Sequence, residues 1–362
     1  MQLPRRISVR APGRICLFGE HQDYLDLPVI AAAIDRHIFI RGSRRQDNEF
    51  HIHLTDLGKT EQFPLASHLP CQHEKDYFRS GLNVVMRLGV NPGSGWDCSV
   101  HGTIPINAGT SSSSALMVAW ILFLLTAAGD ARADDPGFVA ELAFQAEVTE
   151  FNQPGGRMDQ YTSSFGGIIY LDPQTQQTET LTARPGPFVL GDSRQPKSTS
   201  AILASVKQDA QAAAAAIAAF IPDFHFRTTS PETVQPFLSR LSPRQAELLL
   251  ANLIDFQLLR EALHLLRSRD TDLDKLGLLL NRHHEQLRDR KRISTEKIDA
   301  MLAASLEAGA LGGKINGSGG GGCMFALAPG REEHVAAAIR AQGGVPHLLT
   351  IDPGACVEEI GW

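Results

Sequence analysis

Four consecutive serines stand directly before the longest apolar segment of the chain. Residues 105–115 read PINAGTSSSSA, and the apolar segment continues to Ala128. The first N–H groups of a helix have no partner within the helix, and the helix dipole adds positive potential there. Small residues leave these groups open to an anion, and serine hydroxyls can extend the site to a phosphate or a cation. The segment therefore predicts a phosphate site at a helix N-terminus, in preference to a flexible serine linker.

A second polar cluster follows an apolar run in RICLFGEHQDY, from Arg14 to Tyr24. Glu20, His21 and Asp23 stand together at the end of a predicted strand. Carboxylates accept hydrogen bonds from pairs of hydroxyl groups, so the cluster suits a polyhydroxylated ligand. The alternative is an ordinary solvated turn.

Asp159 lies in the segment NQPGGRMDQYTSSFGG, three residues after a proline and two glycines. These residues allow a tight backbone path just before the carboxylate. An aspartate held against a hydroxyl group and a cation can act as a general base. By itself, however, an aspartate after a turn also fits a helix cap.

A dense glycine run, GGKINGSGGGGC, covers Gly312 to Cys323 and formally contains GxGxxG. The dinucleotide fingerprint requires a strand before it and a helix after it. Here a predicted helix over residues 295–308 precedes the run and an apolar strand follows it, so a Rossmann site is disfavoured. The glycines still allow the backbone to approach a ligand or a neighbouring loop closely. His283 and His284 point in different directions on a predicted helix and are interpreted as a packing pair.

The elements around these residues indicate an α+β protein. Short β-like runs alternate with turns between residues 5 and 60, and helices are predicted over residues 77–88, 115–128 and 136–151. The polar, proline-bearing segment 172–187 suggests a boundary, so we expect domains at 1–180 and 181–362. Several helices follow, and the chain ends with strands flanking a helix near residues 332–342.

Bulk composition excludes several classes of protein. The 362 residues carry a net charge of −6 without a basic block, which argues against a nucleic-acid surface. The N-terminus lacks a signal-peptide core, and the apolar segment after the serines is too short for a membrane span. Five scattered cysteines without CxxC spacing favour reduced thiols. We therefore expect a cytoplasmic protein, without nucleic-acid or membrane partners, acting as a monomer or weak homodimer.

The three motifs in this order resemble the GHMP kinase superfamily. APGRICLFGEHQDY is similar to its first motif, PINAGTSSSSA to its second and GGKINGSGGGGC to its third. Within it, GEHQDY, the MDQ around Asp159 and HHEQLRD at 283–289 resemble the galactokinase branch. The resemblance implies a ribosomal-protein-S5-like N-terminal domain and a ferredoxin-like C-terminal domain, with the active site in the cleft between them.

The resemblance also implies an ATP-dependent sugar 1-kinase with a role for each motif residue. Asp159 takes the proton of the anomeric hydroxyl, and Arg14 neutralises charge beside it. The remaining implied roles are sugar binding by Glu20, His21 and Asp23; ATP binding by Gly109, Ser111, Ser112, Ser113 and Tyr77; Mg²⁺ binding by Ser113 and Glu147; and closure of the pocket by Gly317, Gly319 and Gly320.

Departures from the galactokinase pattern leave the acceptor open. Leu25-Asp26-Leu27-Pro28 follows Tyr24 in place of asparagine and glycines, and the chain has no tyrosine after Tyr170 for the expected sugar contact. Another monosaccharide, a mevalonate-type alcohol, or a non-catalytic sugar sensor remain as alternatives.

Overall fold

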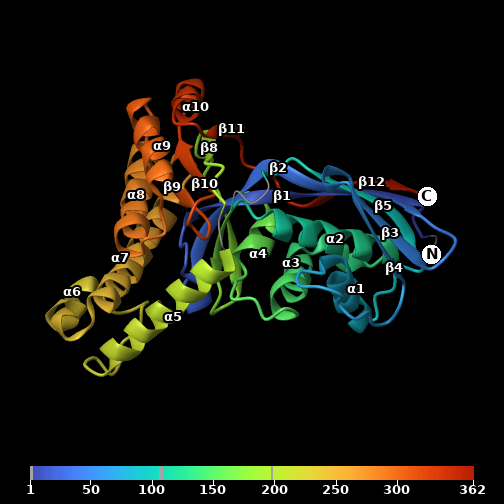
Figure 1. Cartoon of the computed structure of the whole chain (residues 1–362), viewed down its shortest axis with the longest axis horizontal. Helices are drawn as coiled ribbons and strands as arrows, with labels where there is room; N and C mark the ends of the chain where they lie inside the picture. The colour runs from blue at the N-terminus through green and yellow to red at the C-terminus, as the bar shows by residue number, and fades with distance from the viewer. Residues whose placement is uncertain (1–2, 106–108, 197–198) are drawn as a thin grey trace.

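The computed structural model describes residues 3–105, 109–196 and 199–362. The described residues form two β-sheets with helices packed against them (Figure 1). The larger sheet has eight strands, in the order β12-β1-β2-β5-β3-β4, with β6 pairing to β2 and β7 to β6. Its strands are β1 (Arg6–Phe18), β2 (Val29–Arg44), β3 (Glu49–Leu54), β4 (Lys59–Pro64), β5 (Trp96–Gly102), β6 (Ile168–Asp172), β7 (Gln177–Leu181) and β12 (Cys356–Gly361).

The long strands β1 and β2 replace the several short strands that the sequence predicted. The expected break in β1 at Pro12 and Gly13 is instead a shift in the β1–β2 register, which lets the strand continue to Phe18. The continuous strand carries Arg14 into the middle of the molecule.

Four helices cover one face of this sheet: α1 (Tyr77–Arg87), α2 (Ser112–Ala128), α3 (Pro136–Phe144) and α4 (Met158–Phe165). The side chains of α2 are buried from Ser114 to Ala127 except for the partly exposed Leu116, because the helix lies between the sheet and its neighbours. The predicted helix over 136–151 ends as an α-helix at Phe144 and continues as a π-helical turn, Gln145–Thr149.

The smaller sheet has the order β11-β8-β10-β9 and is wholly antiparallel. Its strands are β8 (Phe188–Asp192), β9 (Gly312–Asn316), β10 (Cys323–Leu327) and β11 (Val345–Leu349). The accompanying helices are α5 (Thr199–Ala218), α6 (Pro231–Val234), α7 (Pro243–Leu266), α8 (Leu273–Glu285), α9 (Glu296–Glu307) and α10 (Glu332–Ala341).

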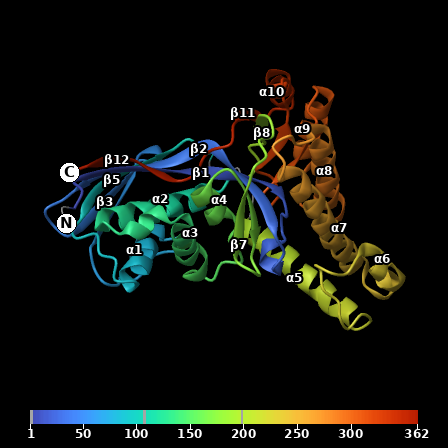
Figure 2. The same cartoon turned by 180° about the vertical axis from the view of Figure 1, so that it is seen from behind.

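The chain crosses back to the larger sheet at its end. Strand β12 pairs with β1, from Arg6 opposite Gly361 to Arg10 opposite Cys356, so both ends of the chain lie at one end of that sheet (Figures 1 and 2). The division at residue 180 stays a prediction, although β8 is the first strand of the smaller sheet. Within the described residues, none of the helices is both long and apolar enough to cross a membrane.

Candidate active site

Most of the predicted motif residues line one pocket of about 330 Å³, whereas Gly319 and Gly320 do not line it. They come from β1, the turn after it, the N-terminus of α2, the π-helical turn, the start of α4 and the loop after β9. The lining includes Arg14, Glu20, His21, Asp23, Tyr77, Gly109, Ser111, Ser112, Ser113, Glu147, Asp159 and Gly317. Residues 106–108 of the serine motif lie outside the described residues.

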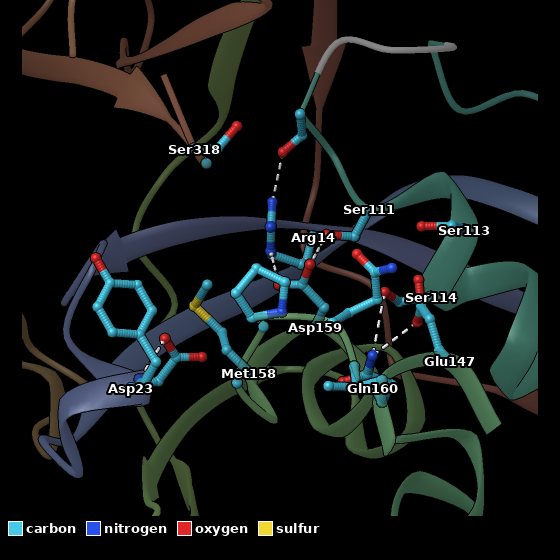
Figure 3. A pocket seen from close by; sticks show the side chains of 18 of the residues that line it. Arg14, Asp23, Ser111, Ser113, Ser114, Glu147, Met158, Asp159, Gln160 and Ser318 are labelled. Carbon is cyan, nitrogen blue, oxygen red and sulfur yellow. Dashed lines mark hydrogen bonds and ion pairs between the residues drawn. The ribbon is translucent and has the colours of Figure 1, made fainter. Parts of the chain in front are cut away.

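Arg14 and Asp159 form an ion pair in the middle of the pocket (Figure 3). Arg14 Nε donates to Asp159 Oδ1 at 2.7 Å, and Arg14 Nη1 donates to the Gly109 carbonyl oxygen at 2.6 Å. The Arg14 side chain is 6% exposed and that of Asp159 is 29% exposed. The carboxylate is therefore held by a buried cation while one side of it remains open to a ligand.

Ser111 reaches the same carboxylate from the N-terminus of α2. Its hydroxyl donates to Asp159 Oδ2 at 2.6 Å. Ser111 is the N-cap of α2, with φ +60° and no hydrogen bond from its side chain to the helix. A left-handed conformation is uncommon for a residue other than glycine and asparagine. The conformation directs this hydroxyl toward Asp159, and the sequence did not reveal that contact.

The serine motif packs directly onto β1. The Arg14 N–H donates to the Thr110 carbonyl oxygen at 3.1 Å. A Cβ atom on Gly13 would lie 2.7 Å from that oxygen, so only glycine permits this approach. Asn316 adds a brace from β9: its side chain accepts from the Cys16 N–H at 2.8 Å and donates to the Gly109 carbonyl at 2.9 Å.

Glu147 lies on the other side of the Arg14–Asp159 pair from Asp23 (Figure 3). Gln160 Nε2 donates to Glu147 Oε2 at 2.7 Å. Burial raises the pKa of Glu147, while hydrogen bonds from Ser113, Ser114 and Gln160 oppose that rise. A buried carboxylate with a serine hydroxyl beside it is the hard oxygen donor set that Mg²⁺ prefers, so Glu147 and Ser113 fit the predicted metal role.

The π-helical turn explains how Glu147 reaches this position. Such turns insert an extra residue into a helix, re-aim its side chains and recur at functional sites. Tyr77, at the start of α1, lies next to Ser113 and Glu147: burial and the Glu147 charge raise the pKa of its phenol, and a hydrogen bond with Ser113 opposes the rise. Tyr77 therefore borders the pocket beside the predicted metal residues. Its adenine contact stays a prediction.

Asp23 occupies the opposite end of the pocket, in the short 3-10 turn Asp23–Leu25. Burial raises the pKa of Asp23 to about 6, with a further contribution from the Asp159 charge. The backbone of Gly156 passes directly against it: a Cβ atom there would lie 1.9 Å from Asp23 Oδ2. The glycines before Asp159 thus make room for this carboxylate.

Glu20 and His21 border the pocket but are tied to protein groups. The Glu20 carboxylate accepts from the Lys314 ammonium, and the residue is 1% exposed. His21 Nε2 lies 3.0 Å from the Ser318 carbonyl oxygen, and Nδ1 lies 2.8 Å from the Tyr24 hydroxyl. Because a carbonyl only accepts, Nε2 carries the proton of this contact. Their sugar contacts stay predictions.

The glycine-rich loop follows β9 and contributes Gly317 and Ser318 to the pocket. Gly317, Gly319 and Gly320 have φ values of +77°, +80° and +72°. The Gly320 N–H donates to the Ile293 carbonyl at 2.7 Å, so the middle of the loop is attached to the segment after α8.

Sequence reasoning missed three side chains of this region: Gln160, Lys314 and Asn316. Each of these residues is at most 2% exposed. Gln160 donates to Glu147, Lys314 donates to Glu20, and Asn316 donates to the Gly109 carbonyl oxygen. Lys314 and Asn316 flank an isoleucine within the glycine run, just before Gly317. The sequence did offer a signal for these two residues: in the segment GGKIN they are the polar side chains among glycines and an isoleucine.

Comparisons with known proteins match most of the chain. Residues 76–167 match the GHMP kinases N terminal domain, residues 252–345 the GHMP kinases C terminal domain, and residues 2–44 the galactokinase galactose-binding signature. A mevalonate kinase of Thermococcus sibiricus is 30% identical over 371 residues, covering 98% of this chain and 99% of that protein. A galactokinase of Haemophilus influenzae is 28% identical over 338 residues, covering 89% of this chain and 85% of its own length.

Among solved structures, Lactococcus lactis galactokinase complexed with galactose superposes with a TM-score of 0.83 at 21% identity, covering 97% of this chain and 95% of that one. This likeness shows the same two-part fold. The ordered motifs, the matched domains and the full-length relatives together establish that the chain belongs to the GHMP kinase family, whose members transfer a phosphoryl group from ATP to a sugar or another alcohol.

Proposed function

We propose that this protein phosphorylates the anomeric hydroxyl of a neutral monosaccharide, with Asp159 as the general base. The observation that carries the proposal is the position of the Arg14–Asp159–Ser111 group. It lies between Glu147 and Ser113 on one side and Asp23 on the other (Figure 3). This order suits a phosphoryl donor on the side of Glu147 and Ser113 and a polyhydroxylated acceptor on the side of Asp23.

Phosphoryl transfer requires positioning and charge neutralisation more than covalent help. The open N-terminus of α2 receives phosphate oxygens, and Ser112 and Ser113 extend it. Glu147 and Ser113 would hold Mg²⁺, which would supply charge neutralisation at the phosphate groups. Asp159 Oδ2 accepts the proton of the acceptor hydroxyl, while Arg14 stabilises the negative charge that develops beside it.

The charge of the acceptor side supports a neutral substrate. Asp23 and Asp159 both face it, and Arg14 is already paired with Asp159; Lys75 is a further cation in the pocket lining. A carboxylate on the acceptor would be brought toward two like charges, which is unfavourable in a partly buried pocket. Hydroxyl groups, in contrast, can donate to the Asp23 carboxylate.

A mevalonate-type alcohol is the second candidate, supported by the mevalonate kinase that is 30% identical over nearly the whole chain. The same base and metal residues would serve it. Its carboxylate would be brought toward the Asp23 carboxylate, which is unfavourable, although Lys207 Nζ lies 5.6 Å from the centre of the Tyr24 ring at that end. A non-catalytic sensor is the weaker alternative, because Ser111, Ser112, Ser113 and Asp159 are all in place.

The decisive experiment is an ADP-release assay with galactose, N-acetylgalactosamine, arabinose, fucose, glucose, galacturonate and mevalonate. We expect ADP with at least one neutral sugar, little with galacturonate or mevalonate, and an acid-labile anomeric phosphate by ³¹P NMR. Asp159→Asn should lose most of the turnover and keep the fold. Turnover of mevalonate alone would replace the sugar assignment, and binding of a sugar without any ADP would support the sensor.

A further inference from the structure

A buried charge cluster lies directly behind the acceptor side of the pocket. It consists of Glu20, Asp255 of α7, His283 of α8, Lys291 and Lys314 of β9, each at most 1% exposed. The proposed phosphoryl transfer uses none of the four members from the C-terminal half. Five titratable groups fully withdrawn from water are costly unless they are paired, so their arrangement calls for a physical reason.

The two lysines converge on the same residue. Lys314 Nζ donates to the Glu20 carboxylate, to the Cys16 carbonyl at 2.8 Å and to the Ile315 carbonyl at 2.9 Å. Lys291 Nζ donates to the Glu20 main-chain carbonyl at 3.0 Å and lies 2.9 Å from Asp255 Oδ2. Glu20 is thus held at its backbone and at its side chain by cations from the other half of the chain.

The charges within the cluster balance. Two carboxylates face two ammonium groups, and His283 lies between the carboxylates, 3.8 Å from Glu20 Oε2 and 3.7 Å from Asp255 Oδ1. Burial and the two lysine charges hold the pKa of His283 well below its ordinary value, so the ring is neutral. The ring also stacks on Phe18 at the end of β1, with centroids 5.6 Å apart.

The backbone held by the lysines is itself strained. The strained residue is His21, with φ +60°, whereas Gly19 on the other side of Glu20 has φ +101°, a conformation that glycine adopts without strain. A strained conformation such as that of His21 persists at functional sites only where the surrounding structure over-determines it. The turn leads directly to Asp23, two residues after His21, and only a short stretch of chain separates the held carbonyl from the acceptor side.

We propose that Lys291 and Lys314 are positioning residues for the acceptor: they hold the Gly19–Asp23 turn in its strained conformation and thereby fix Asp23 in the pocket. Neither lysine touches the acceptor. The inference rests on the proposed function only in placing the acceptor on the Asp23 side. It assigns to the C-terminal half a role in acceptor recognition, in addition to the pocket closure that is predicted for its glycine-rich loop.

The sharpest test removes an ion pair without leaving a buried charge. The double variant Lys291→Met/Asp255→Leu deletes the bond to the Glu20 carbonyl and its counter-charge together, a replacement that proteins often tolerate. The matched control is Glu179→Gln/Arg267→Gln, which removes an exposed ion pair between the two halves of the chain, away from the pocket. If the first variant does not fold, Lys291→Gln/Asp255→Asn retains the volume and polarity of the site.

Two readouts are expected to change in the double variant and not in the control. Hydrogen exchange of residues 19–27 should become faster, because amides such as Gln22 and Leu27 are bonded within this turn. The acceptor KM should rise by at least about tenfold, since small displacements of a binding group are costly, while the ATP KM stays within about twofold.

Unchanged exchange in residues 19–27 would overturn the inference, and so would faster exchange with an unchanged acceptor KM. An equal rise in both KM values would indicate general loosening of the pocket and would also overturn it. Failure of the proposed function can be distinguished from failure of this inference. If the proposed function is wrong, the unmodified protein releases no ADP with any sugar. The exchange measurement then still tests whether the lysines hold the turn.

Discussion

The Ser111 hydroxyl donates a 2.6 Å hydrogen bond to Asp159 Oδ2 from a residue in the left-handed conformation. The sequence motif predicted that this serine binds ATP. In the structure its hydroxyl is bonded to the proposed base, with Arg14 on the other carboxylate oxygen, and its ATP contact stays a prediction. We therefore propose that Ser111 serves the acceptor chemistry, whereas Ser112 and Ser113 serve the nucleotide side.

Ser111→Ala should lower kcat by roughly tenfold or more, because a hydrogen bond to a charged group contributes about 1.5–3 kcal/mol. The ATP KM should change little. Steady-state kinetics with both substrates varied measures the two effects, and Ser112→Ala provides the matched control on the nucleotide side. A raised ATP KM at unchanged kcat would return Ser111 to the phosphate role.

Gly156→Ala should impair acceptor binding. The added Cβ would lie 1.9 Å from Asp23 Oδ2, so the carboxylate must move. We expect the acceptor KM to rise at least about tenfold with little change in ATP KM. The neighbouring Gly155→Ala is an ideal control, because the nearest atom to its Cβ is a Val148 methyl group at 3.7 Å. Equal kinetics of the two variants would contradict the assignment of Asp23 to the acceptor side.

Glu147→Gln should raise the Mg²⁺ concentration needed for half-maximal activity by about tenfold or more, because a carboxylate oxygen binds Mg²⁺ more strongly than a neutral amide oxygen. Burial raises the pKa of Glu147, so its ionised form opposes folding, and the variant should be at least as stable as the parent near neutral pH. Magnesium titrations and thermal unfolding measure both. Glu141→Gln, at a carboxylate bonded to Arg157, is the control. An unchanged magnesium requirement would exclude Glu147 as a ligand.

Asp23→Asn should make the protein more stable at alkaline pH. The pKa of Asp23 is raised to about 6, so its ionisation opposes folding progressively as the pH rises from about 4 to about 6 and fully above that range. We expect a gain of about 1–3 kcal/mol at pH 8, allowing for partial solvent screening, and almost none at pH 4.

Denaturant unfolding of Asp23→Asn at the two pH values tests this sign, with Asp26→Asn in the same turn as a control. The same variant should bind the acceptor more weakly. A stability gain that is independent of pH would show that ionisation of Asp23 is not its source.

The sequence alone was sufficient for the family, for the helix after the serines and for most, though not all, of the residues that meet in the pocket. These features are local or depend on chain order: a run of small residues before an apolar segment predicts a helix N-terminus, and three ordered motifs identify the fold. Asp159, Arg14, Ser113 and Glu147 are brought together as the motifs implied. Their roles remain predictions until the variants are measured.

Only the tertiary structure decided which partner each polar side chain takes. Ser111 faces Asp159 rather than a helix amide, Glu20 is bound by Lys314 from a strand 294 residues later, and β12 returns to pair with β1. Hydrogen bonds and ion pairs form only when two polar groups are placed to within a few tenths of an ångström of the right distance. These groups belong to residues remote in the chain, so no periodicity or spacing encodes the contacts. The chain order thus determined the family and its motifs, whereas packing between the two sheets determined how the pocket is built.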